Sequence, residues 1–141
     1  MSVVSSTVAG RRLLLATVAL VGADVIGVFL AVSAGLTAWG KVWGFDIVGF
    51  VPLPMMVADL VLAWLAARNV RPPIGRVAAI LLSVICLVSV LAGLFDGDMT
   101  SEPMTTWSVL WGVVLILLTA VVGLLAVVRA KELRHGEVVE R

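Results

Sequence analysis

Two aspartates interrupt long apolar stretches of this sequence. Asp24 lies at the centre of VGADVIGVF (residues 21–29), and Asp59 lies inside MMVADLVLAW (residues 55–64). A carboxylate in apolar surroundings is unstable unless it is paired, hydrogen-bonded or protonated. The chemistry that such residues support is therefore the binding of a proton, a cation or a cationic ligand.

The composition of the chain places these aspartates in a membrane. Of its 141 residues, 62% are hydrophobic and 13% are charged, and the mean hydropathy is +1.18. A soluble domain has about 25% charged residues and about half apolar ones. The net charge of +1 provides no basic field of the kind that binds nucleic acid, so we expect no nucleic-acid partner.

Four apolar runs are long enough to cross a bilayer, which takes about 20 helical residues. They cover residues 13–38, 47–67, 77–95 and 107–128. Because they do not alternate as barrel strands do, the sequence predicts an all-α fold, an integral membrane four-helix bundle in one domain over residues 1–141. A cleaved signal peptide is the alternative for the first run. Its apolar core would be about 7–15 residues long, and this run is longer and contains Asp24.

The basic residues predict the orientation of the bundle. Lysine and arginine concentrate in cytoplasmic loops. Nine of the ten basic residues fall in the N-terminus, the second loop (68–76) and the C-terminal tail, and only Lys41 falls on the other side. We therefore expect cytoplasmic N and C termini and a location in a bacterial plasma (inner) membrane, with the lipid bilayer as the first partner. The tryptophans fall where boundary residues are expected, at the outer side (Trp39, Trp43, Trp107, Trp111) and the inner side (Trp64).

The two aspartates are expected at similar depth. Asp24 lies about 18 Å along a helix from Arg12, and Asp59 lies about 13 Å from Arg68. The two helices are adjacent and antiparallel, so we expect both carboxyl groups near the midplane, within about one turn of each other. No lysine, arginine or histidine lies in any run to pair with them. Because a charge at that depth costs at least about 2.5–3.5 kcal/mol, we expect at least one of the two to be protonated.

Two local patterns surround the acids. Small residues recur at a strict spacing of four in the first run, which predicts a close packing seam that Asp24 borders; they are Ala19, Ala23, Gly27, Ala31 and Gly35. Pro52 and Pro54 remove two backbone donors at the start of the second run. A kink there, above Asp59, would open a pocket toward the outer side, and an ordinary helix start at a proline is the alternative.

The candidate proton- or ligand-binding residues are therefore Asp24 and Asp59. The residues that we expect to line their site are polar, small or adaptable positions on all four helices: Thr17, Gly27, Met55, Met56, Ala63, Ser83, Cys86 and Thr119. The sequence has no glycine-rich phosphate loop, nucleophile elbow or metalloprotease helix, and its single cysteine and single histidine fit no zinc spacing. We assign no catalytic residue, metal site or cofactor.

Three functions are compatible with this pattern. The first is binding or transport of an apolar or cationic ligand linked to a proton or cation at the acid pair. The second is an accessory or structural subunit of a larger membrane complex, in which the acids only join helices. The third is an intramembrane acid–base enzyme acting on a lipid or isoprenoid-like substrate, although no second catalytic group such as histidine or tyrosine accompanies the acids. For a bundle this small we expect a homo-oligomer or a partner membrane subunit.

The orientation is tested by cysteine labelling in intact cells. In a chain lacking Cys86, a membrane-impermeant thiol reagent should label Ser101→Cys and leave Ser5→Cys unlabelled, because the basic side faces the cytoplasm. Labelling of Ser5→Cys from outside would show that the orientation is wrong.

Overall fold

The computed structural model describes residues 7–35, 38–43, 53–68, 72–95 and 106–139. For residues 72, 107–108 and 136–139 only the backbone is described. Within these ranges the secondary structure is four α-helices and one short 3-10 turn, with no strand. The described part of the chain is therefore all-α, as predicted.

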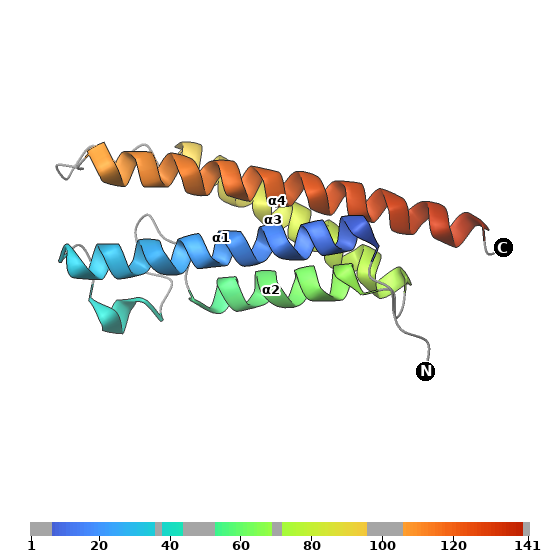
Figure 1. Ribbon diagram of the computed structural model, residues 1–141, viewed down its shortest axis with the longest axis horizontal. Helices are drawn as coiled ribbons and strands as arrows, with labels where there is room; N and C mark the ends of the chain where they lie inside the picture. Colours follow the sequence, from blue (N-terminus) through green and yellow to red (C-terminus); the bar gives the residue numbers. More distant parts are fainter. Residues whose placement is uncertain (1–6, 36–37, 44–52, 69–71, 96–105, 140–141) are drawn as a thin grey trace.

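The four helices run alternately up and down. They are α1 (Val8–Ser33), α2 (Leu53–Ala67), α3 (Pro72–Phe95) and α4 (Thr106–Val139), with the 3-10 turn η1 (Trp39–Lys41) between α1 and α2. Each helix packs against its two neighbours in the ring α1–α2–α3–α4, and the start of α1 lies at the same end of the bundle as the end of α4 (Figure 1). We call this end the terminal end and the opposite one the η1 end.

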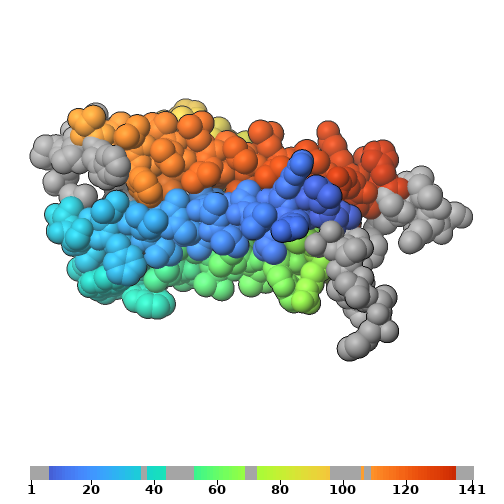
Figure 2. Space-filling model, viewed as in Figure 1, coloured from blue at the N-terminus to red at the C-terminus, as the bar shows by residue number. Residues whose placement is uncertain are grey.

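Three of these helices are long and apolar enough to cross a membrane. They comprise Val8–Ser33, Pro73–Phe95 and Val109–His135, whereas the apolar helix Leu53–Ala67 has only 15 residues. Large apolar side chains on the outer faces are exposed, among them Leu15, Val84, Leu87, Leu117 and Leu124. Figure 2 shows one such face, where α1 and α4 lie side by side. An apolar surface of this extent suits contact with lipid and not with water.

The helix ends follow local chemistry. α1 begins at Val8 because the Thr7 hydroxyl accepts a hydrogen bond from the Gly10 amide at 3.3 Å, which caps the helix. It ends at Ser33, before the end expected at residue 38, and Gly35 follows with a φ of +74°, a left-handed conformation that favours glycine. α2 has Pro54 in its first turn, where a missing amide hydrogen is tolerated. The expected kink at Pro52 lies outside the described residues.

α4 is longer than its apolar run. Its 34 residues span about 51 Å, which exceeds the hydrocarbon thickness of about 30 Å. The helix continues past Gly136 to Val139 and extends beyond the other helices at the terminal end (Figure 1). The charged tail therefore forms a helical projection.

The buried face of α1 differs from the expected seam. Its buried residues recur every three or four positions: Gly10, Leu13, Thr17, Leu20, Asp24, Gly27, Val28 and Ala31. A strict spacing of four drifts by about 40° per step around a helix of 3.6 residues per turn. Ala19 is accordingly exposed and Gly35 lies beyond the helix, so the continuous seam is wrong at both ends. Asp24 lies within the buried face and not at its border.

Two glycines allow close approach of backbone segments at the terminal end. A Cβ atom on Gly10 would lie 2.9 Å from the Ala67 carbonyl oxygen, and one on Gly75 would lie 3.3 Å from the Leu65 carbonyl oxygen. The main core cluster draws on all four helices: Leu13, Leu20, Ala63, Ala66, Ala78, Ala79, Leu82, Cys86, Val122 and Ala126. A smaller cluster of Val28, Val42 and Met56 joins α1, α2 and the residue after η1.

Two glycines of α1 provide a matched test of this packing. Gly22→Ala should stabilise the protein by up to about 1 kcal/mol, because alanine favours helix and nothing lies within 4 Å of the new Cβ atom. Gly10→Ala should instead destabilise it by about 1–3 kcal/mol, because the methyl group meets the backbone of α2. Thermal unfolding in detergent measures both changes. Equal shifts would contradict the close contact between α1 and α2.

Candidate functional site

Both aspartates lie inside the bundle. Asp24, in the buried face of α1, is 4% exposed. Asp59, in α2, is half-buried, and its Oδ1 atom is buried without a hydrogen-bond partner in the described part of the chain. A buried polar atom with no partner costs about 1–3 kcal/mol, and more when it is charged. Asp59 Oδ1 is therefore an atom at which a bound proton or cation would be strongly stabilising.

The two carboxyl groups influence each other electrostatically. The charge of Asp59 acts on Asp24, so the structure brings the two predicted residues within interaction range. The ion pair found among the described residues joins Arg129 to Glu132, and neither aspartate forms one there. Because two nearby like charges repel, binding of a single positive charge would relieve both desolvation and repulsion.

The depth of the two aspartates differs from the expectation. The contact of Gly10 with Ala67 fixes the register of α1 against α2. From that level Asp24 lies about 21 Å along α1 and Asp59 about 12 Å along α2, given a rise of 1.5 Å per residue. The offset of about 9 Å exceeds the one turn of about 5.4 Å that was expected. Asp24 therefore lies closer to the η1 end than Asp59.

Cys86 of α3 lies within the electrostatic range of Asp59. The side chain is 2% exposed, and the charge of Asp59 acts on its thiol group. On its other side, a Cβ atom on Gly123 of α4 would lie 3.1 Å from the Cys86 Cβ atom. Cys86 and Gly123 therefore bring α3 and α4 into close contact.

The hydroxyl groups expected to line the site are used within their own helices. Thr17 is buried and donates to the Leu13 carbonyl oxygen at 2.9 Å. Thr119 is half-buried and donates to the Leu115 carbonyl oxygen at 2.8 Å. Each hydroxyl would have to leave this bond, or accept a second one, to serve a ligand.

The remaining expected lining residues fall into separate groups. Met56 is 2% exposed and packs in the small cluster with Val28, while Ala63 belongs to the main apolar core. Gly27 is buried in α1, and Met55 and Ser83 are half-buried in α2 and α3. Among the described residues, no three or more His, Cys, Asp or Glu side chains are grouped so that they could hold a metal ion.

Sequence reasoning missed the role of Arg129, which it treated only as a basic residue of the tail. The side chain is 1% exposed. Its Nε atom donates to the Ala66 carbonyl oxygen at 3.0 Å, and Nη1 donates to the Thr7 hydroxyl and to Glu132 Oε2, the latter at 3.2 Å. A signal was present: Arg129 continues the buried series Val122, Ala126 and Leu133 at spacings of three and four.

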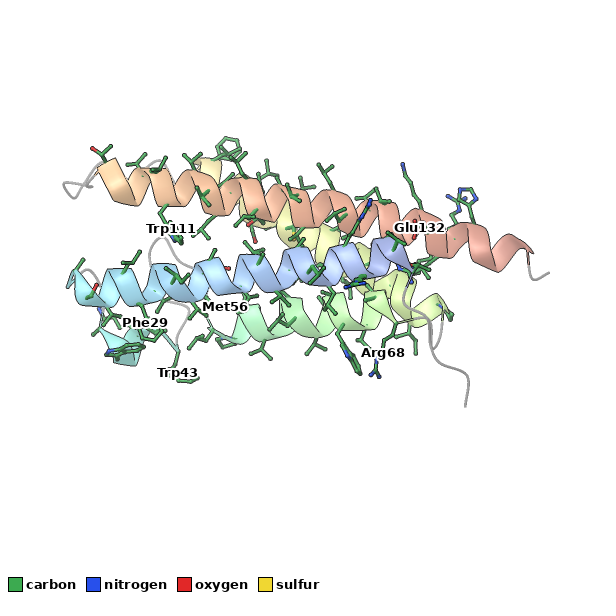
Figure 3. The ribbon with its side chains drawn as sticks, in the orientation of Figure 1. Phe29, Trp43, Met56, Arg68, Trp111 and Glu132 are labelled. Carbon is green, nitrogen blue, oxygen red and sulfur yellow. The ribbon has the colours of Figure 1, made fainter. Side chains whose placement is uncertain are left out.

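Aromatic residues mark the two ends of the bundle. At the η1 end Trp39 and Trp43 are exposed, and Trp39 meets Phe29 edge to face with ring centroids 5.2 Å apart. At the terminal end the guanidinium carbon of Arg68 lies 3.8 Å from the ring centroid of Trp64. Figure 3 shows Phe29 and Trp43 at one end and Arg68 and Glu132 at the other, with Trp111 on the side of α4 that faces α1.

No protein-family model matches the chain, and neither a curated protein nor a solved structure shows significant similarity to it.

The contact between Cys86 and Gly123 allows a direct test of the site. Gly123→Cys should form a disulfide with Cys86 under mild oxidation, because disulfides join Cβ atoms about 3.5–4.5 Å apart and small shifts bring this pair into that range. Asp24→Cys paired with Asp59→Cys, without Cys86, should not bridge, because of their axial offset. Loss of free thiols and peptide mapping distinguish the two. A disulfide between the cysteines at positions 24 and 59, without one between positions 86 and 123, would show that the register of α1 against α2 is wrong.

Proposed function

We propose that this protein is a four-helix membrane bundle that binds or transports an apolar or cationic ligand, and that ligand binding is linked to a proton or cation at Asp24 and Asp59. One observation carries the proposal. A buried carboxyl group lies within the electrostatic range of a second one, whose buried Oδ1 atom has no hydrogen-bond partner among the described residues.

The membrane location is supported by the outer surface and by the charges. Three helices are apolar enough to span a bilayer. The basic residues of the described helices lie toward the terminal end, whereas Lys41 lies in η1 at the other. Under the positive-inside rule, the terminal end and both termini face the cytoplasm of a bacterial inner membrane. We expect the working form to be a homo-oligomer or a complex with a partner membrane subunit.

The link between ligand and proton follows from charge balance. Two ionised carboxylates inside an apolar bundle are costly, so the empty site is most stable when it holds at least one proton. A cationic ligand supplies the same positive charge. When it binds, the carboxyl group no longer needs the proton to be neutralised and can release it. Binding of the cation and release of the proton are then two sides of one exchange.

The alternatives make different demands on the same residues. For an accessory subunit, a neutral carboxyl group need only hydrogen-bond to another helix, and asparagine could replace it. For an enzyme acting on a lipid, a second catalytic group would have to accompany the acids. Thr17 and Thr119 have hydroxyl groups that we expected to line the site. Both already donate to carbonyl groups within their own helices.

Proton release on addition of a lipophilic cation tests the proposal. Adding tetraphenylphosphonium to the purified protein in weakly buffered detergent should release protons from the wild type. Asp24→Asn and Asp59→Asn keep a similar shape but cannot ionise, so they should fold and release few or none. Asp98→Asn, which removes an acid between the third and fourth apolar runs of the sequence, is the matched control and should behave as wild type. Unchanged release from both site variants would favour the accessory role.

A further inference from the structure

We propose that the outer face of the contact between α1 and α2 binds one anionic phospholipid at the terminal end. Arg11 and Arg68, beside Trp64, hold the phosphate group of this lipid, and its acyl chains follow the apolar side chains of the same face. We call Arg11, Trp64 and Arg68 the basic cluster. This lipid site is separate from Asp24 and Asp59 and extends beyond the function proposed for them.

The three members of the basic cluster lie at nearly one level of the bundle. Gly10 of α1 contacts the backbone of Ala67 in α2, and this contact fixes the level. Arg11 and Arg68 are the next residues of the two segments, and Trp64 lies three residues before Ala67. At a rise of 1.5 Å per residue in antiparallel helices, their Cα atoms fall within about 6 Å of one another along the bundle axis.

Arg11 lies on the outer side of α1, next to α2. Successive residues are about 100° apart around a helix axis. Relative to Gly10, which touches α2, the buried Leu13 lies about 60° to one side and Arg11 about 100° to the other. The Arg11 side chain is exposed. Arg12 is also exposed, but it lies about 100° farther around α1, on the side turned away from α2.

Trp64 and Arg68 lie on the matching outer side of α2. Relative to Ala67, which touches α1, the buried Ala66 lies about 100° to one side. Trp64 and Arg68 lie about 60° and 100° to the other side, and both side chains are exposed. The basic cluster therefore flanks the α1–α2 contact on the face turned away from the core. Figure 3 shows Arg68 at the terminal end of α2.

The stacking of Arg68 on Trp64 prepares a donor for phosphate. The guanidinium carbon lies 3.8 Å from the ring centroid. Stacking uses the flat face of a guanidinium group and leaves the N–H donors in its plane, which suit phosphate oxygens. Neither Arg11 nor Arg68 forms an ion pair with a described side chain, whereas the acid Glu132 pairs with Arg129. The charge of the cluster therefore complements an anionic headgroup.

An apolar strip continues from the basic cluster toward the η1 end. On α1, Leu15 and Val18 lie about one and two turns beyond the cluster, and on α2 Val61 and Val57 lie at matching positions. All four side chains are between 49% and 60% exposed. Basic residues at the end of a membrane span attract anionic headgroups, and tryptophan prefers the headgroup level. A phosphate group followed by acyl chains has the same order of chemistry as this face.

Lipid binding by the delipidated protein tests the proposal. The protein in a neutral detergent is mixed with dioleoyl phosphatidylglycerol or with the zwitterionic dioleoyl phosphatidylcholine, and bound lipid is counted by native mass spectrometry. The first phosphatidylglycerol molecule should bind about tenfold more tightly than phosphatidylcholine, and added salt should reduce this preference. Inorganic phosphate at the same concentration should not displace the lipid, because it has no chains to bind the apolar strip.

Substitutions in the basic cluster locate the site. Arg11→Gln and Arg68→Gln should each weaken phosphatidylglycerol binding about fivefold, because each removes one positive charge beside the phosphate. Trp64→Leu keeps an apolar side chain but removes the ring on which Arg68 stacks, and it should weaken binding about threefold. Arg12→Gln is the matched control. It removes the same charge one residue away, on the other side of α1, and should bind as wild type does.

Three results would overturn the proposal. Equal affinity of the wild type for the two lipids would show that the headgroup is not recognised. Equal losses in Arg11→Gln and Arg12→Gln would show a diffuse attraction to the whole basic end. Displacement of the lipid by inorganic phosphate at the same concentration would show a simple anion site. The first and third measurements use the unmodified chain, and none of the three bears on proton release from Asp24 and Asp59.

Discussion

The structure depends on one constraint: two carboxyl groups lie in an apolar bundle whose own cations are elsewhere. The charge of Asp59 acts on Asp24, while the buried Arg129 donates to the Ala66 carbonyl oxygen, the Thr7 hydroxyl and Glu132 at the terminal end. Burial of unpaired charge is among the largest penalties available to a membrane protein. Under the proposed function, a proton or a cation that is not part of the chain neutralises the acids.

The described side chains of α3 and α4 are more deeply buried toward the terminal end than toward the η1 end. Contacts of Gly10 and Gly75 with neighbouring backbone, together with Arg129, hold the four helices at the terminal end. Toward the η1 end, α3 and α4 bury little, while α1 and α2 keep their own small cluster around Met56.

The sequence predicts the helices well because apolar length and local chemistry are encoded residue by residue. It indicates the burial of Asp24 through its apolar surroundings, but it places that residue beside a seam that a period of four cannot keep on one face. The depth offset of the acids depends on the contact between Gly10 and Ala67, and no pattern in either segment reveals that contact. Arg129 was assigned by its charge, although its spacing from Val122 and Ala126 already marked the buried face.

The charge state of the two aspartates tests the central claim most directly. Infrared spectroscopy of the purified protein resolves the C=O stretch of a protonated carboxylic acid from the bands of a carboxylate. At pH 7, in the absence of added cations, the account predicts a protonated-acid band in the wild type that is weakened or lost in Asp24→Asn or Asp59→Asn. Two fully ionised carboxylates at pH 7, with no bound cation, would contradict it, because neither aspartate forms an ion pair among the described residues.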